Sequence, residues 1–142
     1  MSDQPPLPRS DFDFWVGDWA VHLRETNELI GHNHIERACG GHVLIENYST
    51  VKATFSGTSL NGYDHTGRRW HQCWMDTTGL VLDLYGNLID GAMVMAGEVE
   101  RGKIERITWT PYLDGSVRQH WQQSADDGVS WNTVFDGVYR RL

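Results

Sequence analysis

Turn-forming residue pairs recur along the chain at roughly even spacing, and this constrains the fold more than any other feature of the sequence. They are Thr26-Asn27, Gly40-Gly41, Thr66-Gly67, Thr78-Gly79, Asp90-Gly91, Arg101-Gly102, Asp114-Gly115 and Asp127-Gly128. Glycine in such pairs supplies the positive φ that tight hairpin turns need, so the flanking strands are antiparallel neighbours. A long meander of strands tends to close into a barrel, because closure removes both exposed edges.

The segments between the turns alternate apolar and polar residues, which predicts an all-β protein with an antiparallel up-and-down β-barrel of about ten strands. We expect strands at residues 17–25, 28–37, 42–50, 56–64, 69–76, 80–88, 92–100, 103–111, 116–124 and 130–141. One short helical turn is expected at residues 11–15, with Asp11 as its cap. The polar, Pro-rich residues 1–10 predict a flexible N-terminal arm, and residues 11–142 a single barrel domain.

Charge and composition argue against several classes of partner. The formal net charge is −7 and the Lys and Arg residues are scattered, whereas nucleic-acid binding needs a basic face. No apolar stretch is long enough to cross a membrane and no signal peptide opens the chain, so no membrane partner is expected. Cys39 and Cys73 are the only cysteines, which indicates a reducing, cytoplasmic setting and leaves a single disulfide open.

Hairpin register assigns residues to the two faces of the sheet, and the more apolar face is expected inside. The inner face collects Trp19, Val21, Leu23, Asn33, Ile35, Leu44, Glu46, Tyr48, Trp70, Gln72, Trp74, Leu80, Leu82, Leu84, Met93, Met95, Arg106, Thr108, Gln119, Trp121, Trp131, Phe135 and Tyr139. The outer face collects His71, Asp83, Asn87, Glu98, Glu105, Arg118, His120, Gln122 and Asp136. Val81, Tyr85, Ile107 and Trp109 are also expected outside, where they favour a homodimer.

Polar side chains inside the barrel carry the functional hypothesis. A buried charge is costly unless it is paired, so Glu46 and Arg106 either meet in a structural network or line a cavity and orient the polar part of a ligand. The other residues expected to bind that ligand are Asn33, Tyr48, Trp70, Gln72, Trp74, Met95, Thr108, Gln119, Trp121, Trp131 and Tyr139. The predicted function is binding of a small hydrophobic or amphipathic molecule, without a cofactor.

Catalysis in the same cavity is the alternative. A cofactor-free isomerase, cyclase or hydratase would use Glu46, its pKa raised by burial, as general base. Arg106 would hold an oxyanion or carboxylate as a forked donor, with Gln72 or Tyr48 as further donors. No nucleophile elbow and no phosphate-binding glycine loop is present in the sequence. A structural domain whose barrel is filled by tryptophan rings also stays open.

Two histidines and a glutamate alternate along one expected strand. His32, His34 and Glu36 have the i, i+2 spacing that places side chains on one side of a strand, where they would suit a metal. The register that points Ile35 inward points this side outward, so no metal site is expected. The opposite register at Thr26-Asn27 would bring both histidines inside.

Two sets of motifs resemble known families. Gly17-Asp18-Trp19 resembles the Gly-x-Trp signature of lipocalins and related calycin barrels, which implies that Trp19 plugs a closed end beneath Arg140 or Arg141. The second set covers nearly the whole chain and consists of Phe12–Trp19, Ser59–Asp64, Trp70–Asp76, Asp90–Val94, Thr108–Pro111, Val117–Trp121 and Phe135–Arg140. In this order they resemble a bacterial family catalogued only as a domain of unknown function and opened by Phe-x-Phe-Trp-x-Gly-x-Trp. The resemblance implies a small calycin-like β-barrel and transfers no catalytic residue; His32 and His34 depart from its pattern.

Overall fold

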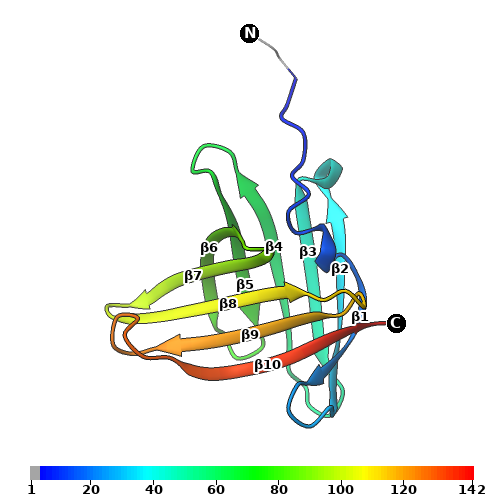
Figure 1. The fold of residues 1–142 in the computed structure, drawn as a ribbon, viewed down its shortest axis with the longest axis vertical. Helices are drawn as coiled ribbons and strands as arrows, with labels where there is room; N and C mark the ends of the chain where they lie inside the picture. The colour runs from blue at the N-terminus through cyan, green and yellow to red at the C-terminus, as the bar shows by residue number, and fades with distance from the viewer. Residues whose placement is uncertain (1–3) are drawn as a thin grey trace.

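Ten antiparallel strands follow one another around a closed barrel in the computed structural model, which describes residues 4–142 (Figure 1). They are β1 (Gly17–Leu23), β2 (Leu29–Ala38), β3 (Val43–Thr50), β4 (Ser56–Asp64), β5 (Arg69–Asp76), β6 (Val81–Ile89), β7 (Ala92–Glu100), β8 (Lys103–Pro111), β9 (Val117–Ser124) and β10 (Asn132–Arg141). Each strand pairs with its neighbours in the chain, and β1 pairs with β10. The predicted all-β, up-and-down barrel is therefore confirmed.

The hairpins use the turn residues that the sequence supplies. At the turn between β6 and β7, Asp90 and Gly91 have φ values of 50° and 83°, the two positive values of a type I′ turn. This turn twists in the same sense as the strands that it joins, so the hairpin closes in the expected register, with Leu88 opposite Met93.

The N-terminal segment contains one short 3-10 helix, η1 (Asp13–Trp15), at the place predicted for a helical turn. Asp11 does not cap it, contrary to our expectation; its carboxylate instead accepts a hydrogen bond from Trp70 Nε1 at 3.1 Å. Residues 4–10 are exposed and form neither helix nor strand, and residues 1–3 of the predicted arm lie outside the described residues. A second 3-10 helix, η2 (Cys39–Gly41), links β2 to β3. No helix within residues 4–142 is long and apolar enough to cross a membrane.

Aromatic rings fill one end of the barrel. Phe12 stacks on Trp15 with ring centroids 4.7 Å apart, and both rings contact Trp109, at 5.1 and 5.5 Å. Trp70 meets Phe12 edge-on at 5.8 Å. All four rings are buried, and they form a plug that closes the barrel where the chain enters it.

Trp19 lies beside this plug with Arg141 packed over it. The guanidinium carbon of Arg141 is 4.2 Å from the ring centroid, and its nitrogens donate to the carbonyl oxygens of Val16 and Phe14. Trp19 Nε1 donates to the carbonyl oxygen of Trp15 at 2.8 Å. Arg141 therefore occupies the place expected for Arg140 or Arg141.

A β-bulge at Val99 corrects the predicted faces of β8. The register between β7 and β8 shifts between Glu98 and Glu100, so Gly97 pairs with Glu105 and not with Arg106 as expected. One extra residue exchanges the two faces of the strand that follows. Glu105 and two neighbours expected outside, Ile107 and Trp109, are therefore buried and face inward, which removes both apolar side chains from the expected dimer surface.

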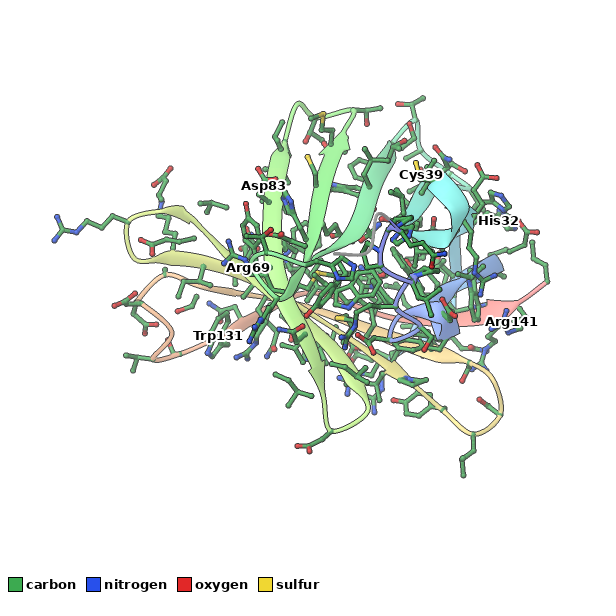
Figure 2. All side chains as sticks on the ribbon, turned by 90° about the horizontal axis from the view of Figure 1, so that it is seen from above. His32, Cys39, Arg69, Asp83, Trp131 and Arg141 are labelled. Carbon is green, nitrogen blue, oxygen red and sulfur yellow. The ribbon has the colours of Figure 1, made fainter. Side chains whose placement is uncertain are left out.

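Two residues of β8 that were expected inside the barrel, Arg106 and Thr108, lie outside it for the same reason. Arg106 Nη2 donates to Gln122 on the outer face at 2.9 Å, and its guanidinium stacks 3.7 Å above the ring of Trp131. Thr108 shares the outer face of β8 with Arg106, because alternate residues of a strand point the same way. Trp131, also expected inside, precedes β10 and lies on the outer side beneath Arg106; Figure 2 shows it away from the centre of the barrel. Leu80, also expected inside, is 37% exposed just before β6 begins.

A second departure restores the predicted faces of β9. Pro111 pairs with Val117 across a longer loop than the two-residue turn expected at Asp114-Gly115. This shifts the register by one residue again, so Ile107 pairs with Trp121 and Trp109 with Gln119. Gln119 and Trp121 therefore point inward, as predicted.

We expect Gly86→Ala to destabilise the protein by about 2–3 kcal/mol, because overpacking forces the backbone apart. A Cβ at Gly86 would overlap the carbonyl oxygen of Val94 on the paired strand. Gly62→Ala is the matched control, since its Cβ would come no nearer than 3.4 Å to the His42 carbonyl oxygen. Urea unfolding of both variants measures the difference; equal losses of stability would contradict the close approach of β6 and β7.

Candidate functional site

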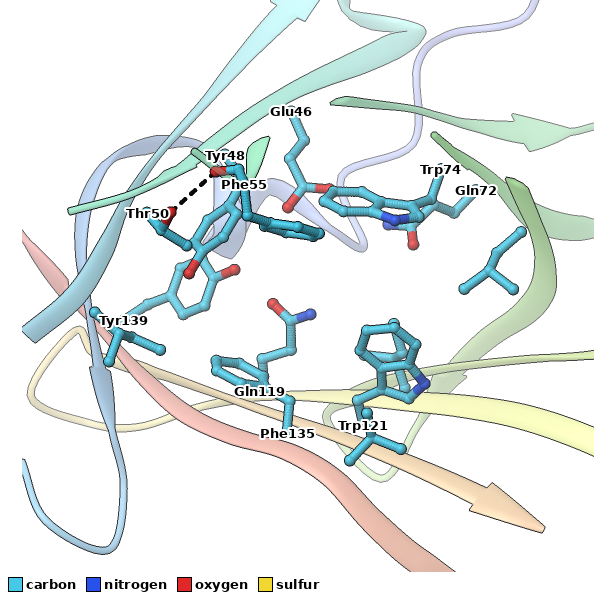
Figure 3. Close-up of a pocket in the computed structure, with 14 residues that line it drawn as sticks. Glu46, Tyr48, Thr50, Phe55, Gln72, Trp74, Gln119, Trp121, Phe135 and Tyr139 are labelled. Atoms are coloured by element: carbon cyan, nitrogen blue, oxygen red, sulfur yellow. Dashed lines mark hydrogen bonds between the residues drawn. The ribbon is translucent and has the colours of Figure 1, made fainter. Parts of the chain in front are cut away.

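Beyond the aromatic plug the barrel is hollow and encloses a cavity of about 280 Å³ (Figure 3). Its walls are Ile30, Glu46, Tyr48, Thr50, Phe55, Gln72, Trp74, Leu82, Ile107, Gln119, Trp121, Val134, Phe135 and Tyr139. Thr50, Phe55 and Val134 lie at the strand ends opposite the plug, so the cavity has its mouth there. Glu46, Gln72 and Trp74 face Gln119 and Trp121 across the space (Figure 3).

The structure brings seven of the predicted site residues to the cavity wall: Glu46, Tyr48, Gln72, Trp74, Gln119, Trp121 and Tyr139. Asn33 is buried behind the wall and bonded to Glu46, Trp70 belongs to the plug, and Met95 lies in the core. Arg106, Thr108 and Trp131 lie outside the barrel, as described above. The roles of the seven in binding stay a prediction.

Two wall residues that the sequence did not predict, Ile30 and Val134, point into the cavity because each is the extra residue of a β-bulge. In the pairing of β1 with β2 the register shifts and leaves Ile30 as the extra residue, and in the pairing of β10 with β9 it leaves Val134. Bulges re-aim side chains, and both of these residues line the cavity. Neither position carries a glycine or proline that would have signalled a bulge. Leu82 and Phe135 were already expected on the inner face.

Glu46 is the central polar group of the site. It lies on β3 opposite Ile35 of β2 and Ser59 of β4, and it is only 3% exposed. Its carboxylate accepts hydrogen bonds from Ser59 Oγ at 2.6 Å and from Asn33 Nδ2 at 2.7 Å. Both oxygens are therefore held in place by neighbouring strands, while the group still borders the cavity.

A chain of hydrogen bonds continues from Glu46 around the wall. Asn61 Nδ2 donates to Ser59 Oγ at 2.9 Å, and Gln72 Nε2 donates to Asn61 Oδ1 at 2.8 Å. On the other side, Asn33 Nδ2 also donates to the Tyr139 hydroxyl at 2.9 Å. Strands β2 to β5 and β10 thus contribute to one polar network, which fixes the orientation of the carboxylate.

Burial raises the pKa of Glu46 to about 7, although the hydrogen bonds from Ser59 and Asn33 act in the opposite direction. Burial, followed by the charge of Glu46, also raises the pKa of Tyr48 and of Tyr139. In the described part of the chain no Lys, Arg or His lines the cavity. Glu46 consequently titrates near neutral pH, and its negative charge has no counter-ion in the cavity wall.

Two indole rings on opposite walls are held through their N–H groups. Trp121 Nε1 donates to Glu105 at 2.6 Å, and Trp74 Nε1 donates to Asp76 at 2.9 Å. Glu105 is buried and also accepts from Gln123 at 2.7 Å. Because both donors are occupied by carboxylates, the rings offer the cavity their apolar surfaces.

His32 and His34 lie on the outer face of β2, as the favoured register predicted, and Figure 2 shows His32 at the periphery. His34 Nδ1 contacts the Asp18 carboxylate, and its Nε2 lies 3.4 Å from Glu36. The hydrogen bond to Asp18 raises the pKa of His34. Within residues 4–142 no group of three or more His, Cys, Asp or Glu side chains is placed to hold a metal ion.

No protein-family model and no curated protein matches this chain. No family membership is therefore assigned from the motifs described above, and the cavity is the feature from which a function can be inferred.

We expect the free energy of unfolding to fall by about 3 kcal/mol between pH 4.5 and pH 7 through Glu46 alone. The folded protein holds the Glu46 proton up to a pKa of about 7, whereas the unfolded chain releases it near 4.5, so the stabilisation is complete at low pH and is lost as the pH rises. Glu46→Gln removes this dependence, and urea unfolding at a series of pH values measures it.

Glu25→Gln is the control for this experiment, because Glu25 is exposed and its charge stays in water in both states. Parallel pH profiles of the wild type and Glu46→Gln would contradict the burial of a titrating carboxyl group at this position.

Proposed function

We propose that the protein binds a small, mostly apolar molecule in its barrel cavity and orients it with a few polar groups. The cavity itself is the observation that carries this proposal. Protein interiors are normally close-packed, so a space of about 280 Å³ inside a barrel supports the binding of a small molecule there. Its volume lies near the lower end of the range for small-molecule sites, roughly 300–1,000 Å³.

The wall has the composition expected of such a site. Apolar and aromatic side chains form most of it, and the polar groups are few and held in place, as Glu46 is by Ser59 and Asn33. A structural domain whose barrel is filled by aromatic rings would account for the half of the barrel that contains the plug. It would not account for the half that contains the cavity. The combination of a closed barrel, a Trp19–Arg141 contact and an internal cavity supports the calycin-like character that the motifs implied.

Location and assembly remain expectations of the same proposal. Cys39 and Cys73 are both free thiols, which favours a reducing compartment such as the cytoplasm. Of the four apolar residues expected to form a homodimer surface, two are accessible: Val81, which is 53% exposed, and Tyr85, which is partly exposed.

Catalysis by proton transfer is the second candidate, and one observation favours it. Glu46 borders the cavity, and its pKa of about 7 suits a general base at neutral pH. Arg106 lies outside the barrel and takes no part, so only neutral donors such as Tyr48 and Gln72 would hold a developing negative charge.

If a substrate is turned over in the cavity, Glu46→Gln abolishes turnover and leaves substrate binding within a few-fold of wild type. Steady-state kinetics together with equilibrium binding of the same compound test this. Full activity in the variant would exclude Glu46 as the base.

The binding proposal is tested with N-phenyl-1-naphthylamine, a neutral probe whose fluorescence rises in apolar surroundings. We expect saturable binding, and we expect Val134→Trp to weaken it at least tenfold, because an indole at this wall position fills the mouth. Val129→Trp is the control, since Val129 is 83% exposed in the loop before β10 and does not line the cavity. Equal binding by both variants would place the probe outside the cavity. No saturable binding at all would remove the support for a ligand-binding cavity.

A further inference from the structure

We propose that the ligand of the cavity is an organic cation, a molecule with an ammonium head and a compact apolar body. The inference rests on the proposed function and adds the charge of the ligand to it. Three features support a cationic ligand: the aromatic walls, the Glu46 carboxylate without a basic partner in the wall, and the positions of the arginines outside the cavity.

Aromatic rings surround the cavity from several strands. The six rings in its wall are Tyr48, Phe55, Trp74, Trp121, Phe135 and Tyr139, contributed by β3, the loop after it, β5, β9 and β10. Phe55 lies between Tyr48 and Trp74, with centroid separations of 6.2 and 6.5 Å. A cation within about 6 Å of an aromatic face is attracted by the ring, and the attraction is strongest where water is excluded.

Among the described residues, the acidic and basic side chains in the cavity wall amount to one carboxyl group. Glu46 is the one ionisable carboxyl group among the wall residues, and no basic side chain of the described residues stands beside it. Gln119 lies on the wall that faces Glu46 and is 9% exposed. Its side-chain oxygen is buried and accepts no hydrogen bond. An ammonium group between these walls would meet a carboxylate and an unused acceptor, whereas an anion would be repelled by the Glu46 carboxylate.

The two indoles are polarised toward a cation. Trp121 and Trp74 each donate their N–H to a carboxylate, Glu105 and Asp76 respectively. A hydrogen bond to an anion shifts electron density into the indole, which makes the ring face more negative and strengthens its attraction for positive charge. Glu105, buried behind Trp121, places a second carboxyl group near the cavity.

Arginine side chains outside the cavity stack on four other aromatic rings of this protein. Guanidinium groups stack on Tyr63, Tyr85, Trp131 and Trp19, at 4.4, 4.1, 3.7 and 4.2 Å from the centroids. None of these four rings lines the cavity. In the described part of the chain the six cavity rings have no such internal cation, so the place is free for one that comes from outside.

Binding of a cation is linked to the protonation of Glu46. The groups that face its carboxylate are Asn33 from β2, Tyr48 from β3, Ser59 from β4, and Tyr139 from β10, and of these only the two tyrosines titrate. Gln72, Leu82, Ile107 and Gln119 complete the facing walls and carry no charge. A cation therefore binds the ionised form of Glu46, and its affinity rises with pH through neutrality.

The experiment compares two compounds of the same shape, benzyltrimethylammonium and its uncharged carbon isostere neopentylbenzene. The ammonium keeps its charge at every pH, so only the protein titrates. Both are measured by displacement of N-phenyl-1-naphthylamine. At pH 8.5 we expect the cation to bind at least tenfold more tightly than the isostere, and its affinity to fall roughly thirtyfold at pH 5.5, as Glu46 with a pKa of about 7 becomes protonated. The isostere should bind equally at both pH values.

Glu46→Gln reduces the preference for the cation to less than threefold and removes its pH dependence. Unchanged binding of neopentylbenzene by this variant shows that its cavity is folded, and Glu25→Gln is the matched surface control. Neopentylbenzene binding as tightly as the cation in the wild type would overturn the inference and leave the proposed function standing. Displacement by neither compound, with no saturable probe binding, would overturn both.

Discussion

The pairing of β1 with β10 closes the sheet, and every other feature of the molecule depends on that closure. A closed barrel has no free edge, but it creates an interior that side chains must either fill or line. This chain fills one half with Phe12, Trp15, Trp70 and Trp109 and lines the other half with rings that leave space between them. The plug and the cavity are thus two parts of one solution, because the plug supplies the buried apolar surface that a hollow half does not.

Burial of Glu46 shows where the structure gives up stability. An apolar residue at this position would avoid the desolvation of a carboxyl group, yet the surrounding strands supply Ser59 and Asn33 to hold it, and Asn61 and Gln72 to hold them. Such an arrangement constrains side chains on four neighbouring strands around a group that destabilises the protein when ionised. Departures from the most stable core commonly mark functional sites, and here the departure borders the cavity.

The sequence was sufficient to predict the strands and most of the faces, because glycine-containing turns and alternating side chains are local signals. It placed Glu46, Trp74 and Trp121 correctly on the inner face. It failed at β8, because Val99 adds a residue to β7 at a position that is neither glycine nor proline, and Glu105 and Arg106 exchange sides as a result. The interior therefore contains two acids where the sequence predicted an acid and a base. The energy that selects the bulge comes from packing Ile107 and Trp109 inside, which is a property of the whole barrel and not of the turn.

The C-terminal end of the described chain lies near the plug. Arg141 covers Trp19, and Leu142 N donates to the Asp18 carbonyl oxygen at 3.1 Å, which ties the C-terminus to the start of β1. The mouth lies at the opposite end, between the loops that follow β1, β3 and β9. A tether attached to the C-terminus would consequently anchor the protein by its sealed base. Molecules immobilised in that way would keep their openings toward the solution, an orientation that suits the barrel as the recognition element of a surface-bound sensor.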